Sequence, residues 1–257
     1  MTAEIRPGTD VVVPNDELRA IAVQVVILAA GLGSRLGRSL PKPLTCLRDG
    51  RTILQRQLDC LRDAFGDDVD VTLVVGHQAG LVMPAAPGTK FVQNPEYRQT
   101  NTAKSLLLGL RASAPGGVLW LNGDVVFHPR LLDLVVPAVQ ADRSFVCVNT
   151  AAVAEEEIKY TVDADGHIVQ LSKTVQGGLG EAIGINYVAA ADKPVLIAHL
   201  AACADDDYFE RGIETAIEHA ALEVLPLDIS AYPAVEVDFE SDLARANALC
   251  SGSADHA

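Results

Sequence analysis

Residues 28–44 read Leu28-Ala29-Ala30-Gly31-Leu32-Gly33-Ser34-Arg35-Leu36-Gly37-Arg38-Ser39-Leu40-Pro41-Lys42-Pro43-Leu44, directly after the apolar, β-branched run that begins at Val23. Small residues at the carboxyl end of a parallel strand let the backbone approach phosphate groups closely, and successive N–H groups there form an anion-binding nest. Arg35 and Lys42 add a guanidinium fork that suits paired phosphate oxygens and an ammonium that is a compact point charge. The stretch therefore predicts a phosphate-binding loop, and residues 31–42 are called the phosphate loop below.

Two other interpretations of these glycines compete with this one. As a dinucleotide fingerprint, the glycines at positions 31, 33 and 37 match imperfectly, and no ribose-binding acid stands at the usual offset after a second strand. A purely structural glycine turn would not explain why Arg35 and Lys42 stand in this stretch. An NAD(P)-dependent oxidoreductase stays open as an alternative from another enzyme class.

Short β-branched runs alternate with helical patterns on both sides of the loop. The alternating segments are Val23–Leu28, Ile53–Ala64, Val71–Val75, Phe91–Gln93, Asn101–Arg111, Val118–Leu121, Pro129–Gln140 and Ser144–Val148. This order is typical of an α/β protein, and we expect a three-layer α/β/α, Rossmann-like fold with a mostly parallel twisted sheet. Between residues 160 and 188 the pattern changes to alternating strands around the turn Asp163-Ala164-Asp165-Gly166, which predicts a β-hairpin inserted beside the sheet as an acceptor-binding region.

The length of 257 residues suits one large core. We expect a single domain over residues 23–250, with a nucleotide-binding half at about 23–150 and an acceptor-binding half at about 151–235. Residues 1–22 and 251–257 are expected to be polar tails.

The charge balance limits the partners of the chain. With 20 Lys and Arg against 34 Asp and Glu, the formal charge is −14, which argues against nucleic acid and against an anionic membrane surface. A phosphate site must then be built locally from backbone N–H groups, a few cations and a metal ion. No apolar run approaches the about 20 residues of a membrane span, no basic-then-apolar leader opens the chain, and the five cysteines are scattered, so a cytoplasmic protein is expected.

Two aspartates follow apolar strands that are far apart in the sequence. Asp124 comes shortly after Val118–Leu121, and Asp238 ends the apolar run around Val235 and Val237. Ligands of open α/β sheets bind at the carboxyl ends of the strands, and Mg²⁺ commonly takes one or two carboxylates together with substrate phosphates and water. The pair predicts a magnesium site.

The stretch from Leu28 to Arg35, followed by Pro41-Lys42-Pro43-Leu44, resembles the signature of the Rossmann-like nucleotidyltransferases, which activate sugar phosphates or phosphoalcohols with an NTP. The resemblance extends along most of the chain and narrows to the bacterial choline-phosphate cytidylyltransferase and phosphonate cytidylyltransferase type. It rests there on Asn94-Pro95-x-Tyr97-x-x-x-Asn101-Thr102-x-x-Ser105-Leu106, on Asn122-Gly123-Asp124, and on Glu236-Val237-Asp238. The interval from Arg35 to Pro41 is shorter than in the common sugar-phosphate members.

The resemblance implies roles for individual residues. Arg35, Lys42 and Lys173 are implied as catalytic cations, and Asp124 and Asp238 as metal ligands. The implied nucleotide-binding residues are Leu28, Ala29, Ala30, Gly31, Gly33, Ser34, Asn101, Thr102, Ser105 and Asn122.

Other residues are candidates for binding the acceptor. Glu181 resembles an acceptor-binding acid that holds an ammonium or a hydroxyl. A quaternary ammonium needs an aromatic cage, for which Tyr160, Tyr187 and Tyr208 are the candidates. Asn101 has a competing interpretation as the cap of the helix that follows it.

The reaction that the resemblance implies is in-line attack by a phosphate or phosphonate oxygen on the α-phosphorus of CTP, with pyrophosphate released and Mg²⁺ as cofactor. The partners are then CTP and a small acceptor, which is a phosphocholine-like phosphoalcohol, a phosphonate or an amino-acid phosphate. A sugar-1-phosphate nucleotidyltransferase that uses UTP, GTP or dTTP is the alternative within the same family. The sequence leaves monomer and homodimer open.

Overall fold

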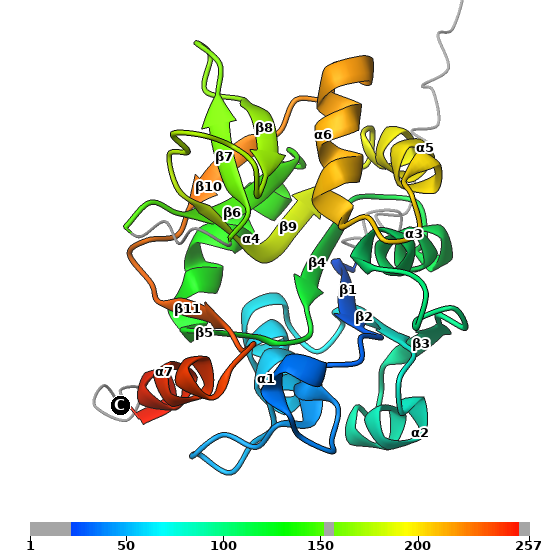
Figure 1. The fold of residues 1–257 in the computed structure, drawn as a ribbon, viewed down its shortest axis with the longest axis vertical. Helices are drawn as coiled ribbons and strands as arrows, with labels where there is room; N and C mark the ends of the chain where they lie inside the picture. The colour runs from blue at the N-terminus through cyan, green and yellow to red at the C-terminus, as the bar shows by residue number, and fades with distance from the viewer. Residues whose placement is uncertain (1–21, 152–156, 252–257) are drawn as a thin grey trace, which may run out of the picture.

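The computed structural model describes residues 22–151 and 157–251, so the tails expected at 1–22 and 251–257 lie almost wholly outside it. Seven strands form the body of one sheet, and Figure 1 shows it running through the middle of the molecule. Their order is β10 (Leu225–Asp228), β6 (Phe145–Asn149), β9 (Glu181–Val188), β4 (Val118–Asn122), β1 (Gln24–Ala29), β2 (Asp70–Val75) and β3 (Lys90–Gln93). The β1–β2, β1–β4, β2–β3 and β10–β6 pairs are parallel. The expected mostly parallel, Rossmann-like sheet is confirmed.

The strand β9 lies inside the sheet, between β4 and β6. The sequence had predicted that residues 160–188 form a hairpin beside the sheet. Strand β9 pairs antiparallel with β4 on one edge and with β6 on the other, and seven of its eight residues are buried. The expected hairpin does form, from β7 (Lys159–Val162) and β8 (Ile168–Ser172), and it joins the sheet through the pair Lys159 and Glu181. Alternating apolar residues predict a strand but do not show which strands it pairs with, because pairing depends on contacts between residues distant in sequence.

Helices cover both faces of the sheet, as expected for three layers. Successive residues of β1 point to opposite faces, so Val25 and Ile27 enter one apolar cluster and Val26 and Leu28 enter the other. The first cluster lies under α1 (Ile53–Phe65) and α4 (Leu132–Gln140), and the second under α3 (Thr102–Ala112), α5 (Lys193–Ala202) and α6 (Phe209–Ala220). The β1 strand is buried on both faces, which explains its continuous apolar run.

Five short helices lie in the connections between the strands and the longer helices. They are η2 (Ser34–Leu36), η3 (Lys42–Leu44), α2 (Ala79–Val82), η4 (Met83–Ala85) and η5 (Pro129–Leu131). The α1 helix begins at a capping box in which the Thr52 side chain accepts from the Gln55 backbone and the Gln55 side chain accepts from the Thr52 backbone. Pro129 opens η5, which leads directly into α4, so one predicted helix is built from two pieces.

A separate two-stranded ribbon crosses the lower part of the molecule in Figure 1, and the sequence did not predict it. It pairs β5 (Val125–Phe127) antiparallel with β11 (Ala234–Glu236). The ladder continues one step further, because the N–H of Val237 donates to the carbonyl of Asp124 at 3.0 Å. The ribbon therefore brings Asp124 and Asp238 together, and α7 (Glu240–Ser251) follows it.

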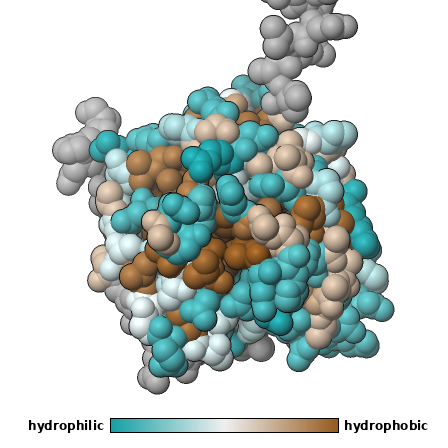
Figure 2. All heavy atoms as spheres, turned by 90° about the horizontal axis from the view of Figure 1, so that it is seen from above, coloured by the Kyte–Doolittle hydropathy of each residue, from teal (hydrophilic) through white to brown (hydrophobic). Residues whose placement is uncertain are grey.

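Figure 2 shows the molecule from above, on the side of the β7–β8 hairpin, with apolar residues near the middle of the face and hydrophilic residues around most of it. Two of the exposed large apolar side chains, Val169 and Leu179, belong to this hairpin region. Within residues 22–151 and 157–251, no helix is long and apolar enough to cross a membrane.

Candidate active site

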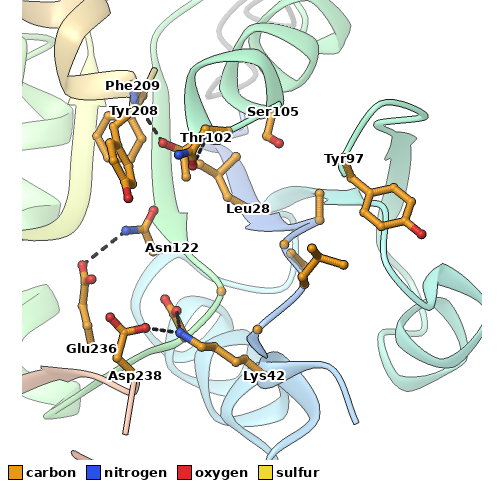
Figure 3. A pocket seen from close by; sticks show the side chains of 18 of the residues that line it. Leu28, Lys42, Tyr97, Thr102, Ser105, Asn122, Tyr208, Phe209, Glu236 and Asp238 are labelled. Carbon is orange, nitrogen blue, oxygen red and sulfur yellow. Dashed lines mark hydrogen bonds and ion pairs between the residues drawn. The ribbon is translucent and has the colours of Figure 1, made fainter. Parts of the chain in front are cut away.

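A cavity of about 460 Å³ opens at the carboxyl ends of β1 and β4. Its wall includes the end of β1, the phosphate loop, the start of α3 and the segment after β11, as Figure 3 shows from close by. Fifteen residues named from the sequence line it: Leu28, Ala29, Ala30, Gly31, Gly33, Arg35, Lys42, Asn101, Thr102, Ser105, Asn122, Asp124, Lys173, Tyr208 and Asp238. The topology therefore gathers segments from across the chain into one site.

Four candidate residues named from the sequence are not among the residues that line the cavity. Tyr187 is 5% exposed, packs in the apolar cluster under α1 and α4, and donates its hydroxyl to Oδ1 of Asp142 at 2.7 Å, so its ring is not a cage for an acceptor. Tyr160 is 4% exposed and packs in the apolar cluster under α3 and α6, so its ring is core and not a cage for an acceptor. Glu181 begins β9 opposite Asn149 and is not among the residues that line the cavity, although its neighbour Ala182 is, so its role in binding an acceptor stays a prediction. Ser34 opens η2 beside the wall.

Lys42 bridges the two aspartates that the sequence proposed as metal ligands. Its Nζ donates to Oδ2 of Asp124 at 3.0 Å and also to Oδ1 of Asp238. Figure 3 shows Lys42 and Asp238 meeting at one end of the cavity. Only 12% of the Lys42 side chain is exposed, so this is a largely desolvated triad of one cation and two anions.

The electrostatics of this triad favour the charged forms. Burial opposes the charge on Lys42, but the neighbouring Asp124 and Asp238 outweigh it and raise its pKa. Burial also works against the carboxylate of Asp238, yet the hydrogen bonds and charges of Lys42 and Arg35 lower its pKa. Lys42 and Asp238 therefore both keep their charges at neutral pH.

Glycines let the phosphate loop close over Lys42. Gly33 has a φ of +63°, and a Cβ there would lie 2.8 Å from the Cγ of Lys42. Gly123 donates its N–H to the carbonyl of Leu28 at 2.9 Å, and a Cβ there would lie 2.7 Å from that oxygen. Side chains at these two positions would push apart the loop and the segment that carries Asp124.

Two arginines tie the phosphate loop to the segment before α7. Nη1 of Arg35 lies 3.0 Å from Oδ2 of Asp238, and Nη2 of Arg38 lies 2.8 Å from Oε1 of Glu240. About half of the Arg35 side chain is exposed, so the guanidinium keeps an open side at the cavity mouth. Surface ion pairs of this kind contribute little to the stability of the fold, so their main effect is to hold the phosphate loop in position.

The α3 end of the cavity is built from a network of polar side chains. Asn101 caps α3 by accepting from the N–H of Thr102 at 2.8 Å, and its amide donates to the carbonyl of Asp206 at 3.1 Å. The amide of Asn94 donates to Ser105 Oγ at 3.1 Å. The Asn101 side chain therefore caps α3, as one of its two interpretations predicted. Its contact with a nucleotide base stays a prediction.

Sequence reasoning missed three glutamates on the cavity wall, Glu157, Glu210 and Glu236. Glu236 accepts a hydrogen bond from Asn122 Nδ2 at 3.2 Å, and burial together with Asp124 and the other two glutamates raises its pKa well above the usual range. Burial raises the pKa of Glu210 to about 7.

A local signal existed for only one of these glutamates. Glu236 stands two residues before Asp238, and side chains at a spacing of two share one side of an extended segment. Glu210 comes into the cavity at the start of α6, far from the phosphate loop in sequence, and no local pattern announces it. Tyr97 and Arg98 also line the wall. Both belong to the segment from Asn94 to Leu106, in which the sequence predicted no role for either.

The pair Asp124 and Asp238 fits a divalent cation. Both carboxylates reach the same ammonium of Lys42, so they converge on one small cationic volume, and their oxygens are the hard ligands that Mg²⁺ prefers. Among residues 22–151 and 157–251, no group of three or more His, Cys, Asp or Glu side chains is arranged to hold a metal ion. The remaining ligands of a cation here would have to come from substrate phosphates and water.

The chain matches a known protein family. The model of the MobA-like NTP transferase domain matches residues 25–213. The chain belongs to this family. The resemblance to nucleotidyltransferases seen in the sequence is confirmed, and the cavity is the candidate substrate site of this domain.

Two curated relatives each match a little over half of this NTP transferase chain. CMP-5'-(3-aminopropyl)phosphonate synthase of Streptomyces rubellomurinus is 40% identical over 156 residues, which are 57% of this chain and 24% of the relative. The bifunctional protein GlmU of Gloeobacter violaceus is 34% identical over 154 residues, 57% of this chain and 32% of that protein. The chain thus matches about a quarter to a third of the length of these relatives.

Solved structures of nucleotidyltransferases share the fold. The inositol-1-phosphate CTP transferase from T. maritima superposes with a TM-score of 0.73 at 18% identity, over 90% of this chain and 95% of that one. The CTP:phosphocholine cytidylyltransferase from Streptococcus pneumoniae gives a TM-score of 0.70 at 19% identity, over 90% of this chain and 100% of that one. At these identities the likeness concerns the fold.

Proposed function

We propose that this NTP transferase is a magnesium-dependent cytidylyltransferase that transfers CMP from CTP to a small acceptor bearing a phosphate or phosphonate, with release of pyrophosphate. The observation that carries the proposal is the bridge of Lys42 between Asp124 and Asp238 beside the glycine-rich phosphate loop. The choice of CTP rests on the 40% identical relative, whose name specifies a CMP-linked phosphonate.

Different residues of the site have different roles in this reaction. Backbone N–H groups of the phosphate loop, with Arg35 and Lys42, hold the triphosphate and neutralise charge that shifts to the leaving pyrophosphate. Lys173 steadies the incoming acceptor anion, and its Nζ already lies 5.1 Å from the centroid of the Tyr208 ring at the cavity wall. No protein nucleophile is required, because the acceptor oxygen is ionised at neutral pH and positioning supplies most of the acceleration.

Asp124 and Asp238 would hold the metal ion, which when bound supplies charge neutralisation at the α-phosphate. Lys42 must then share these carboxylates with the cation. Since its ammonium is on a flexible four-carbon stem, it can turn toward the phosphates while its neighbours keep their positions.

A sugar-1-phosphate nucleotidyltransferase is the second candidate. The GlmU relative of Gloeobacter violaceus favours it, since it is 34% identical over 57% of this chain. Both candidates use the same triphosphate site and differ in the nucleotide base and the acceptor.

Pyrophosphate release tests the proposal directly. The full chain is incubated with Mg²⁺ and each of CTP, UTP, ATP, GTP and dTTP, against a panel of phosphoalcohols, alkylphosphonates, amino-acid phosphates and sugar-1-phosphates. Release with CTP and one small acceptor supports the proposed function. Release only with another NTP and a sugar-1-phosphate favours the second candidate, and NAD(P)H alone raising the melting temperature would favour the oxidoreductase alternative.

A further inference from the structure

The phosphate loop is held from two sides, and Figure 1 shows α7 and α2 at opposite sides of the segment that follows β1. On the α7 side, Leu36 is buried in one apolar cluster with Leu243, and Arg38 pairs with Glu240 at 2.8 Å. Within residues 22–151 and 157–251, no hydrogen bond between backbone groups joins residues 31–40 to another segment. Side chains therefore decide where the loop lies.

The anchor on the α2 side is the side chain of Gln78. Its Nε2 donates to the carbonyl of Ser39 at 3.0 Å, three residues before Lys42. In the described part of the chain, no other hydrogen bond or ion pair joins residues 36–41 to the segment from β2 to η4. Gly37, two residues before Ser39, has a φ of +66°, and its backbone can take several conformations. The bond from Gln78 therefore fixes the chain where it approaches Lys42.

Gln78 makes this contact from a backbone conformation that few side chains adopt. Its φ and ψ are 50° and 38°, in the left-handed region that glycine and asparagine tolerate best. The residue must turn the chain here, because its carbonyl accepts from the N–H of Leu81 at 2.8 Å as α2 begins. Glycine has no side chain and asparagine is one methylene group shorter, so neither would make the turn and also reach Ser39 as Gln78 does.

The turn that carries Gln78 is fixed against the end of β1. The N–H of His77 donates to the carbonyl of Ala30 at 3.0 Å, and a Cβ on Gly76 would lie 2.8 Å from the same oxygen. Ala30 lines the cavity directly before the phosphate loop. The side chain of Gln78 therefore starts from a backbone position that β1 sets, and it connects that position to the far end of the loop.

The amide of Gln78 forms its bond through the nitrogen alone. Its Oε1 is buried and has no hydrogen-bond partner among the described residues. A buried acceptor without a donor is unfavourable for stability, and so is a left-handed backbone at a residue with a side chain. These two features stand at the one residue that ties Ser39 to the α2 side, which indicates that the contact serves the loop more than the fold.

We propose that Gln78 is a positioning residue of this transferase, which acts through Ser39 to hold the phosphate loop in the shape that binds the triphosphate. This inference rests on the proposed function and adds to it a residue that does not line the cavity. Without the bond, the loop is held on the α7 side alone, and Lys42 and the loop N–H groups take a wider range of positions. The triphosphate must then order the loop when it binds, which weakens binding more than it slows the chemical step.

Two variants at position 78 separate the contact from the backbone. Gln78→Met keeps the length of the side chain and has no donor, whereas Gln78→Asn suits the left-handed backbone and is too short. We expect both to raise the Kd of CTP, measured by calorimetry with the full chain, and its KM in pyrophosphate release about 3- to 10-fold. The change in kcat should stay below about twofold. We also expect Gln78→Asn to melt at or above the temperature of the parent, because the shorter amide relieves the backbone.

Tryptic cleavage gives a readout that needs no nucleotide. Trypsin cleaves after Arg38, whose side chain is 42% exposed and which directly precedes Ser39. We expect faster cleavage at this bond in Gln78→Met than in the parent, since a looser loop enters the protease more readily. Gln140→Met is the matched control, because Gln140 is exposed at the end of α4, and it should change neither cleavage nor CTP binding.

The outcomes separate this inference from the function beneath it. An unchanged Kd and KM for CTP in Gln78→Met, or an unchanged cleavage rate after Arg38, overturns the positioning role while cytidylyl transfer by the parent stands. A lower melting temperature of Gln78→Asn with an unchanged Kd also overturns it, since that is the result of a purely structural residue. If the parent binds no nucleoside triphosphate, the proposed function fails, and the cleavage rates still decide whether Gln78 holds the loop.

Discussion

The ammonium of Lys42 lies 3.0 Å from a carboxylate oxygen of Asp124, although the two residues are 82 positions apart and belong to different elements. Lys42 opens the short helix η3, and Asp124 sits in the turn between β4 and β5. The parallel pairing of β1 with β4 places both turns at one edge of the sheet. The contact therefore depends on the topology and ties the phosphate loop to the proposed metal site.

Removal of the Lys42 charge should abolish most of the activity. We expect Lys42→Met to lower kcat/KM for pyrophosphate release about 10²–10³-fold, since one preorganised cation in a low-dielectric site contributes that much to transition-state stabilisation. Lys90→Met is the control, because Lys90 is 69% exposed and pairs with Asp70 on the surface. Turnover of Lys42→Met within a factor of a few of the parent would contradict the proposed mechanism.

Loss of either aspartate should weaken the divalent site. We expect Asp124→Asn and Asp238→Asn to raise the Mg²⁺ concentration for half-maximal activity at least 10-fold, as each removes a charged oxygen ligand. Chelation by EDTA should stop pyrophosphate release by the parent, and added Mg²⁺ should restore it. Mn²⁺ binding followed by electron paramagnetic resonance gives a readout independent of turnover, and Asp59→Asn, at a half-exposed surface position, is the control.

The stability of the free protein should depend on pH through Glu210. Burial raises its pKa from the ordinary 4.5 to about 7, so the folded state binds this proton more tightly than the unfolded state does. The stability that this proton contributes is fully present below pH 4.5 and is lost as the pH rises through 7. Lys173 opposes this shift and favours the charged form of Glu210, while Glu210 in turn raises the pKa of Glu236.

Glu210→Gln removes this dependence. We expect the variant to gain stability relative to the parent as the pH rises from 5 to 8, by up to about 3 kcal/mol. Urea unfolding of both proteins at the two pH values measures the difference, with Glu218→Gln as the exposed control. A pH-independent difference between Glu210→Gln and the parent would mean that Glu210 is not held against ionisation.

A methyl group at Gly184 should damage both fold and site. Gly184 lies within β9 at a φ of +65°, and a Cβ there would overlap Oε1 of Glu236 and the amide of Asn122. We expect Gly184→Ala to cost about 1–3 kcal/mol of unfolding free energy and to disturb the Asn122–Glu236 hydrogen bond. Gly80→Ala is the matched control, because a Cβ at Gly80 meets nothing within 4 Å. Equal stability of the two variants would show that β9 relaxes around the methyl group.

The local sequence determined the elements and the chemistry of the phosphate loop. The apolar run before Ala29 and the glycines after it predict a strand and an open turn because these are properties of neighbouring residues. The same holds for the Thr52–Gln55 capping box, which needs only three residues of separation. Lys42, Asp124 and Asp238 were identifiable because each follows a recognisable strand or lies in a recognisable motif.

Only the tertiary structure decided which of these segments meet. The insertion of β9 between β4 and β6, and the pairing of β5 with β11, are contacts between residues distant in sequence, and they place the Asp238 segment beside Asp124. For the same reason Glu210 was invisible as a site residue, and Tyr160 and Tyr187 were misplaced as cage candidates, since period-two patterning gives the face of a strand but not what covers it. The sequence thus indicated the phosphate loop and its cations, whereas the acidic part of the cavity wall formed only when packing brought three glutamates together.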